Sequence, residues 1–262
     1  MGKTAIEWTD AVYNPVTGCT KVSPGCKNCY AEVLDRRFNH AFVPWTVKAQ
    51  QEEEFVRLQP GSSVTLHPER LQLPIHWKKP RKVFVNSMSD LFHEAVPDEF
   101  IMKVFAIMGF CPGHQFQILT KRPHRMAQFL QSVNPADIDR IGHELTDYEY
   151  PCAGNEPWPL PNVWLGVSVE NQRYADERIP LLLKVQAKVR FVSCEPLLGP
   201  LDLRPWLDQE CSCGIGRYPA PQHGTYCKRR YPNIQWTIVG GESGPHARPM
   251  EIQWARRILK DC

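Results

Sequence analysis

The fold class is decided by residues 163–171, which read VWLGVSVEN. Val163 to Val169 is a short apolar run of mostly β-branched and aromatic residues, which is typical of a strand buried on both faces. The polar residues Glu170 and Asn171 end this run, and a helical pattern follows from Asn171 to Leu183. A strand, a polar junction and a helix in succession predict one βα unit of a parallel sheet.

The same unit recurs along the chain. Five further runs have strand composition, and these are 11–16, 82–86, 116–120, 189–193 and 235–239. Helical patterns follow several of them, at 98–108, 123–131 and 249–259. Six units joined by right-handed crossovers predict an α/β fold, namely a partial (β/α)6 TIM-type barrel, in a single domain over residues 1–262. Residues 40–80 are expected to be an insertion after the first unit, and residues 204–234 a small excursion between the last two strands.

Composition narrows the class of protein. The chain has 262 residues, 42% hydrophobic and 23% charged, which is ordinary for a soluble globular protein. No apolar run approaches the roughly 20 residues that span a bilayer, and the N-terminus does not resemble a secretory signal, so we expect a cytoplasmic protein without a membrane partner. The net charge of +3 is too small to indicate nucleic-acid binding by itself. Ten cysteines in such a chain favour metal binding over disulfides.

Polar side chains stand at the end of each predicted strand after the first. They are Asn86, Ser87, Ser89 and Asp90 after the second, Lys121 and Arg122 after the third, Ser168, Glu170 and Asn171 at the fourth, Cys194 and Glu195 at the fifth, and Glu242 after the sixth. Because the carboxyl ends of parallel strands carry active sites in barrel folds, these residues predict one shared site. For any single junction, helix N-capping is the alternative interpretation.

Three cysteines form the sharpest motif. Cys19, Cys26 and Cys29 have the spacing C-x6-C-x2-C, with Gly18 and Pro24-Gly25 permitting a tight loop. Thiolates suit iron–sulfur clusters or zinc. Three ligands would leave one iron of a 4Fe-4S cluster open, in the way that catalytic zinc keeps an open position. A zinc knuckle completed by a distant residue and three unligated cysteines are the alternatives.

A second cluster lies in the predicted excursion. Cys211, Cys213, His223 and Cys227 could bind a structural zinc ion, since three Cys and one His suit tetrahedral zinc. An auxiliary iron–sulfur cluster or no metal are the alternatives, and Cys152 could replace His223. The basic residues 228–230 adjoin this cluster, so a small knuckle that contacts nucleic acid is a further interpretation.

Several segments together resemble a known family. These are 6–10 (IEWTD), the cysteine loop, 86–93 (NSMSDLFH), 119–123 (LTKRP), 165–172 (LGVSVENQ), 193–199 (SCEPLLG) and 240–244 (GGESG). They resemble the radical S-adenosylmethionine (SAM) superfamily. The amino-acid sequences of these segments most resemble its phage-associated branch, which has a three-cysteine motif. The resemblance implies that the partial barrel is of the radical SAM kind and that Cys19, Cys26 and Cys29 hold a 4Fe-4S cluster. SAM would chelate the open iron and be cleaved to methionine and a 5′-deoxyadenosyl radical.

The resemblance also implies roles at the junctions. Asn86, Ser87, Ser89 and Asp90 would bind the SAM amino group, Lys121 its carboxylate, and Ser168, Glu170 and Asn171 its carboxylate or ribose. Cys194, Glu195 and Glu242 are the catalytic candidates, with Cys194 as a hydrogen-atom donor or, alternatively, as a small buried residue that ends a strand. The C-x6-C spacing is longer than the C-x3-C of most members, and the usual Gly-Gly-Glu after the second strand is absent.

We therefore expect a radical SAM enzyme; the sequence does not name its substrate, for which a nucleic acid or nucleoside is the candidate. It would need a reductant and would work with a partner protein encoded nearby. A non-catalytic zinc-binding nucleic-acid module is the main alternative, and an electron carrier is a third interpretation. Relatives continue with a further apolar segment, so the C-terminal edge is expected to be incomplete and Cys262 exposed.

Overall fold

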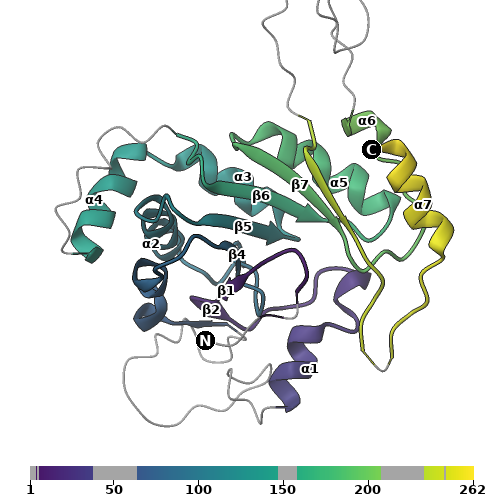
Figure 1. The fold of residues 1–262 in the computed structure, drawn as a ribbon, viewed down its shortest axis with the longest axis horizontal. Helices are drawn as coiled ribbons and strands as arrows, with labels where there is room; N and C mark the ends of the chain where they lie inside the picture. Colours follow the sequence, from purple (N-terminus) through teal and green to yellow (C-terminus); the bar gives the residue numbers. More distant parts are fainter. Residues whose placement is uncertain (1–3, 5, 38–63, 147–157, 208–232, 245) are drawn as a thin grey trace, which may run out of the picture.

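The computed structural model has an α/β fold in which six parallel strands form one sheet (Figure 1). It describes residues 4, 6–37, 64–146, 158–207, 233–244 and 246–262. The strands are β1 (Ala11–Tyr13), β4 (Lys82–Val85), β5 (Gln115–Thr120), β6 (Val163–Ser168), β7 (Val189–Cys194) and β8 (Trp236–Val239). Their order in the sheet is β1-β4-β5-β6-β7-β8, with every pair parallel. All six predicted strands are confirmed as parallel βα units.

A small antiparallel pair divides the first predicted run. β2 (Val16–Thr17) pairs with β3 (Thr65–Leu66), so the run 11–16 contributes only its first half to the large sheet. The chain bends at Asn14-Pro15, where proline has no N–H to continue a ladder. This bend carries the chain out of the sheet and into the cysteine loop.

The predicted helices are confirmed with small shifts at their ends. They are α2 (Asp98–Gly109), α3 (Pro123–Ser132), α5 (Gln172–Lys184) and α7 (Ile252–Asp261). The structure adds α1 (Tyr30–Arg37), α4 (Pro135–Thr146), α6 (Arg204–Leu207) and short 3-10 turns at Pro24–Cys26, Pro68–Arg70 and Leu73–His76. None of the helices in the described residues is long and apolar enough to cross a membrane.

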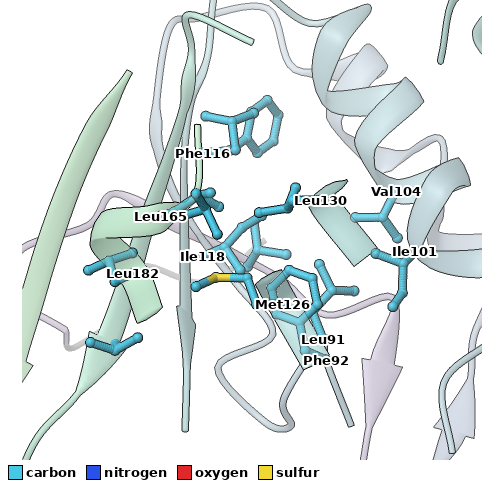
Figure 2. Packing of buried hydrophobic residues seen from close by; sticks show 14 of the residues in the cluster. Leu91, Phe92, Ile101, Val104, Phe116, Ile118, Met126, Leu130, Leu165 and Leu182 are labelled. Atoms are coloured by element: carbon cyan, nitrogen blue, oxygen red, sulfur yellow. The ribbon is translucent and has the colours of Figure 1, made fainter. Parts of the chain in front are cut away.

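The core lies between the sheet and the crossover helices. Because the strand order never reverses, right-handed crossovers place the helices on one face of the sheet. Phe116, Ile118 and Leu165 project from β5 and β6 toward that layer (Figure 2). Met126 and Leu130 of α3 pack against them there, and both side chains are buried. This packing fixes each strand end, and hence each junction, relative to its neighbours.

Aromatic rings gather on the opposite face. The Trp8 ring lies 4.6 Å from the Phe84 ring and 5.9 Å from the Trp236 ring, measured between centroids. Phe84 belongs to β4 and Trp236 to β8, which are four strand spacings apart, or roughly 19 Å in a flat sheet. A single side chain that reaches both rings shows that the sheet is curved, with this face concave. Among the described strands β1 and β8 remain the two edges, so the sheet is open.

Two predicted interruptions fall largely on residues that are not described. Residues 64–80 of the predicted insertion carry β3 and two 3-10 turns, and residues 38–63 lie outside the description. Residues 208–232 of the predicted excursion also lie outside it. Cys211, Cys213, His223 and Cys227 are therefore outside the described residues, as is Cys152.

Candidate functional site

The cysteine loop, residues 18–30, lies across the carboxyl ends of the parallel strands. The Gly18 N–H donates to the Met88 carbonyl over 3.2 Å, and Gly18 forms a bridge with Ser89 in the loop after β4. At the other end of the cysteine loop, the Tyr30 hydroxyl donates to the Ser87 carbonyl. Gly18 has φ of 80°, a left-handed conformation that favours glycine. Both ends of the loop are thus attached to the same junction.

The three thiols between these ends are free and partly accessible. Within the described part of the chain, no three or more His, Cys, Asp and Glu side chains are gathered closely enough to hold a metal. The donor set nevertheless fits an iron–sulfur cluster or zinc, since all three are unpaired thiols on one short loop. Metal binding commonly draws such ligands together as it orders them. Cys19, Cys26 and Cys29 are the residues that would hold the group.

Arg122, directly after β5, contacts the first of these cysteines. Its Nη1 donates to Cys19 Sγ over 3.5 Å, and its Nη2 donates to the Thr20 carbonyl and hydroxyl over 3.1 and 2.8 Å. Burial, with a smaller contribution from Asp90, raises the pKa of the Cys19 thiol to about 12, although Arg122 acts to lower it. The guanidinium therefore supplies the positive charge that a thiolate would need here.

His93 supports the same segment from the β4 junction. Its Nδ1 accepts the Ala95 N–H over 3.0 Å, so the ring proton of the neutral form sits on Nε2 and is donated to the Thr20 hydroxyl over 2.9 Å. Burial and the neighbouring Arg122 lower the pKa of His93. His93 thus acts as a neutral hydrogen-bonding residue of the loop.

Glu170, after β6, holds the middle of the cysteine loop. One carboxylate oxygen accepts the Gly25 N–H over 3.3 Å, and the other accepts from Arg178 Nη1 of α5 over 3.1 Å. Both side chains of this ion pair are almost fully buried, at 1% and 2% exposure. A Cβ on Gly25 would lie 3.2 Å from the Glu170 carboxyl carbon, a tight contact that glycine avoids. Glu170 is committed to positioning the loop.

Glu242, after β8, holds the last part of the loop. Arg248 donates to its carboxylate from the backbone N–H over 2.8 Å and from Nε over 2.9 Å, and Asn28 Nδ2 donates over 2.9 Å. Arg248 also donates to the Pro24 carbonyl over 2.8 Å. The hydrogen bonds from Arg248, with that from Asn28, lower the pKa of Glu242 to about 2. This residue is a permanent carboxylate that joins the last junction to the cysteine loop.

The predicted SAM-binding residues at the β4 junction mostly bond to neighbouring chain. Ser89 donates to the Val16 carbonyl over 2.8 Å, and Ser87 bonds the Asn14 amide group over 3.2 Å. Asn86 has φ of 59° and accepts the Val16 N–H over 3.4 Å, while its Nδ2 is buried without a partner in the described residues. Asp90 accepts four hydrogen bonds, among them one from Thr120 Oγ1 at 2.7 Å and one from Arg122 Nη1 at 3.3 Å.

The remaining predicted residues divide into two groups. Asn171 caps α5 by accepting the Tyr174 N–H, as the capping alternative expects, and Ser168 is buried with its carbonyl bonded to Arg178. Cys194 is fully buried in the hydrophobic core at the end of β7, as the alternative of a small buried residue that ends a strand expects. Cys262 is exposed, as expected.

Lys121, directly after β5, and Glu195, directly after β7, stand at two of the junctions that form the mouth of the site. Neither side chain makes a hydrogen bond or close ion pair within the part of the chain that the structure describes. Burial raises the pKa of the Glu195 carboxyl, the charge of Lys121 lowers it, and that of Glu7 raises it. Glu195 also lies against Gly240, whose added Cβ would be 3.0 Å from the Glu195 carboxyl carbon. One free cation and one free anion thus stand beside the loop.

Of the three arginines that organise the site, sequence patterns placed Arg122 at its junction without giving it a role, and they did not single out Arg178 or Arg248. Arg122 lies within the junction LTKRP, and Arg248 lies six residues after Glu242, so both follow strands closely. Arg178 lies inside a helix, where nothing in the amphipathic pattern distinguishes it from a surface arginine. Their roles depend on carboxylates contributed by other junctions.

Comparison with known proteins gives one match. The model of a protein family described as "Protein of unknown function (DUF5131)" matches residues 3–262. No curated protein and no solved structure matches the chain.

Proposed function

Because the chain belongs to the DUF5131 family, its function is inferred from its own site, and we propose that it is an iron–sulfur enzyme of the radical SAM kind. In this proposal the curved sheet is a partial (β/α)6 barrel, and Cys19, Cys26 and Cys29 hold a 4Fe-4S cluster to which SAM binds. The chemistry that these groups supply when bound is one-electron cleavage of SAM to methionine and a 5′-deoxyadenosyl radical.

The single observation that carries the proposal is how the cysteine loop is held. Side chains or backbone from the junctions after β4, β5, β6 and β8 all bond to it, through Met88, Arg122, Glu170 and Glu242. One buried ion pair, Glu170–Arg178, and one partly exposed pair, Glu242–Arg248, hold this one loop, although its thiols form no disulfide. A loop needed only for structure would not require free thiols at this position, whereas an open-site cluster would.

The topology supports the same reading. Doubly wound sheets bind ligands where the strand order reverses, and this sheet has no reversal. Barrel-type folds bind ligands at the carboxyl ends of their strands, which is where the cysteine loop lies. The aromatic rings of Trp8, Phe84 and Trp236 fill the concave face below these ends and leave the junctions as the open side.

The chain's own residues would then have two roles, which are to orient the cysteine loop and to bind SAM. Arg122, Glu170 and Glu242 orient the loop, because their polar atoms are already bonded to it. Lys121 would meet the carboxylate of SAM, since its ammonium group is free and lies at the mouth. Glu195 would meet the amino group of SAM or a proton on the substrate, since its carboxyl is the free anion beside Lys121.

Anaerobic reconstitution tests the proposal. Wild type treated with iron and sulfide should bind about four irons per chain, and dithionite with SAM should yield 5′-deoxyadenosine. The triple variant Cys19→Ser, Cys26→Ser, Cys29→Ser should lose both the iron and the product. Cys262→Ser changes an exposed cysteine outside the loop and should retain both, as the matched control.

Two other results would overturn it. Zinc bound through the same three cysteines, without SAM cleavage, would favour the non-catalytic nucleic-acid module. Iron bound without any effect of SAM on the cluster spectrum would favour an electron carrier. The substrate class suggested by the family resemblance, a nucleic acid or nucleoside, is tested by adding oligonucleotides and nucleosides and looking for transfer of hydrogen into 5′-deoxyadenosine from a deuterated substrate.

A further inference from the structure

Arg122 commits every N–H of its guanidinium group. An arginine carries five such donors in a planar fork. Nε donates to Glu94 over 2.9 Å, Nη1 to Asp90 over 3.3 Å and to Cys19 Sγ over 3.5 Å, and Nη2 makes the two bonds to Thr20. One side chain therefore joins a thiol, its neighbouring residue and two carboxylates.

This arginine has no room to reorient. It is 6% exposed and lies at the residue before α3, where the β5 junction turns into the helix. Asp90 behind it is itself fixed by Thr120 Oγ1 at 2.7 Å and by the Phe92 and Lys121 N–H groups at 3.0 Å. The N–H that points at Cys19 is thus preset by a network that exists before any ligand binds.

The other two cysteines have no comparable donor. Cys26 Sγ lies 3.8 Å from the Ser23 hydroxyl, a neutral and longer contact. Among the described residues no charged N–H reaches Cys26 or Cys29. The environment of the three sulfurs is therefore asymmetric, since the cationic donor found in the described part of the chain lies at Cys19.

We propose that Arg122 is a positioning residue that hydrogen-bonds the Cys19 ligand sulfur and so makes the bound cluster easier to reduce. This inference rests on the proposed function. Hydrogen bonds to ligand sulfurs and neighbouring charge are among the factors that set iron–sulfur potentials, because they stabilise the added electron. For a cluster that must accept an electron before SAM can be cleaved, such a donor acts directly on the first step.

The test is the reduction potential of the reconstituted protein. Arg122→Lys keeps the positive charge but has one nitrogen, which cannot reach Cys19, Asp90, Glu94 and Thr20 together. We expect the cluster potential, followed by electron paramagnetic resonance, to shift to more negative values. Arg125→Lys is the matched control, because Arg125 of α3 bonds the Val96 carbonyl and Asp98 rather than the cysteine loop, and its potential should equal that of wild type.

A second variant tests the same role if Arg122→Lys does not fold. Thr20→Val removes one acceptor of Nη2 on an exposed loop position and should shift the potential in the same direction by less. If the cluster forms and neither variant moves its potential, the role of Arg122 is overturned while the proposed function stands. If wild type takes up no cluster, both are overturned together.

Discussion

At the scale of single residues, close approaches decide which positions tolerate change. The ring of Phe191 lies over Gly166, and a Cβ there would come within 2.5 Å of it. We expect Gly166→Ala to destabilise the fold by roughly 1–3 kcal/mol, the range for overpacked cores, in urea unfolding. Gly113→Ala meets nothing within 4 Å and should leave the midpoint almost unchanged, and equal midpoints for the two variants would contradict the packing argument.

A second residue-scale prediction concerns the buried pair Glu170–Arg178. Glu170→Ala leaves the Arg178 guanidinium buried without its carboxylate and should cost about 3–5 kcal/mol of unfolding free energy. It should also speed hydrogen exchange at the Gly25 amide, which loses its acceptor. Glu177→Ala, an exposed position on the same helix, is the control and should change neither quantity. A loss below about 1 kcal/mol would mean that the pair is not essential.

Residue identity was predictable only for one half of each contact. Polar junctions named Asp90, Glu170 and Glu242 because they follow strands. Arg122 was also named by its junction, but its pairing with Asp90 could not be assigned, nor could Arg178 and Arg248 as partners, since an ion pair depends on which strands become neighbours and not on spacing. The backbone bonds that Asn171 and Ser89 make to Tyr174 and Val16 likewise appear only in the folded chain.

At the scale of elements, the loop after β8 predicts a dependence on pH. Glu242 has its pKa lowered from 4.5 to about 2 by Arg248 and Asn28. Its stabilisation is therefore fully present above pH about 4.5 and is lost as the pH falls toward 2. Glu242→Gln should lower the unfolding free energy by roughly 1.5–3 kcal/mol at pH 7, the range for charge-assisted hydrogen bonds.

The difference between Glu242→Gln and wild type should narrow as the pH falls from 4.5 toward 2, measured by urea titrations at each pH. Glu251→Gln, an exposed carboxylate near the start of α7, is the matched control and should show a difference near zero at every pH. A gap between Glu242→Gln and wild type that stays constant down to pH 2 would contradict the role of the carboxylate.

Elements were predictable where burial dictates composition. Strands buried on both faces are continuous apolar runs, so β4 to β8 could be read directly. The helix α4 was missed because its pattern, with few apolar residues among acids and bases, resembles a solvated loop. The pair β2 and β3 was missed because two residues carry no periodicity, and its partner strands lie about fifty positions apart.

At the scale of the whole molecule, the curvature of the sheet depends on rings from both of its halves. Trp8 joins Phe84 of β4 to Trp236 of β8. Trp8→Ala should lower the unfolding free energy by up to about 3 kcal/mol, the low end of the range for buried aromatic residues, because Trp8 is half-buried. Trp254→Ala on α7 also removes a half-buried indole and is the comparison variant for the spectroscopic test.

The indoles of Trp8, Trp164 and Trp236 lie close enough to couple, which should give a near-ultraviolet circular dichroism signal. Trp8→Ala should alter this coupled signal, whereas Trp254→Ala should leave it unchanged. An identical spectrum after Trp8→Ala would contradict this arrangement. The contacts between these tryptophans could not be predicted from the sequence, because curvature is a property of the assembled sheet.

The attachment of the cysteine loop to both ends of the chain has a consequence for biosynthesis. Asn28 and Pro24 are bonded to Glu242 and Arg248, more than two hundred positions later. Each strand pairs with its predecessor, so the sheet can grow as the chain leaves the ribosome at about 5–20 residues per second. The loop gains its final contacts only when the last strand has emerged, so its three cysteines reach their final arrangement only in the finished chain.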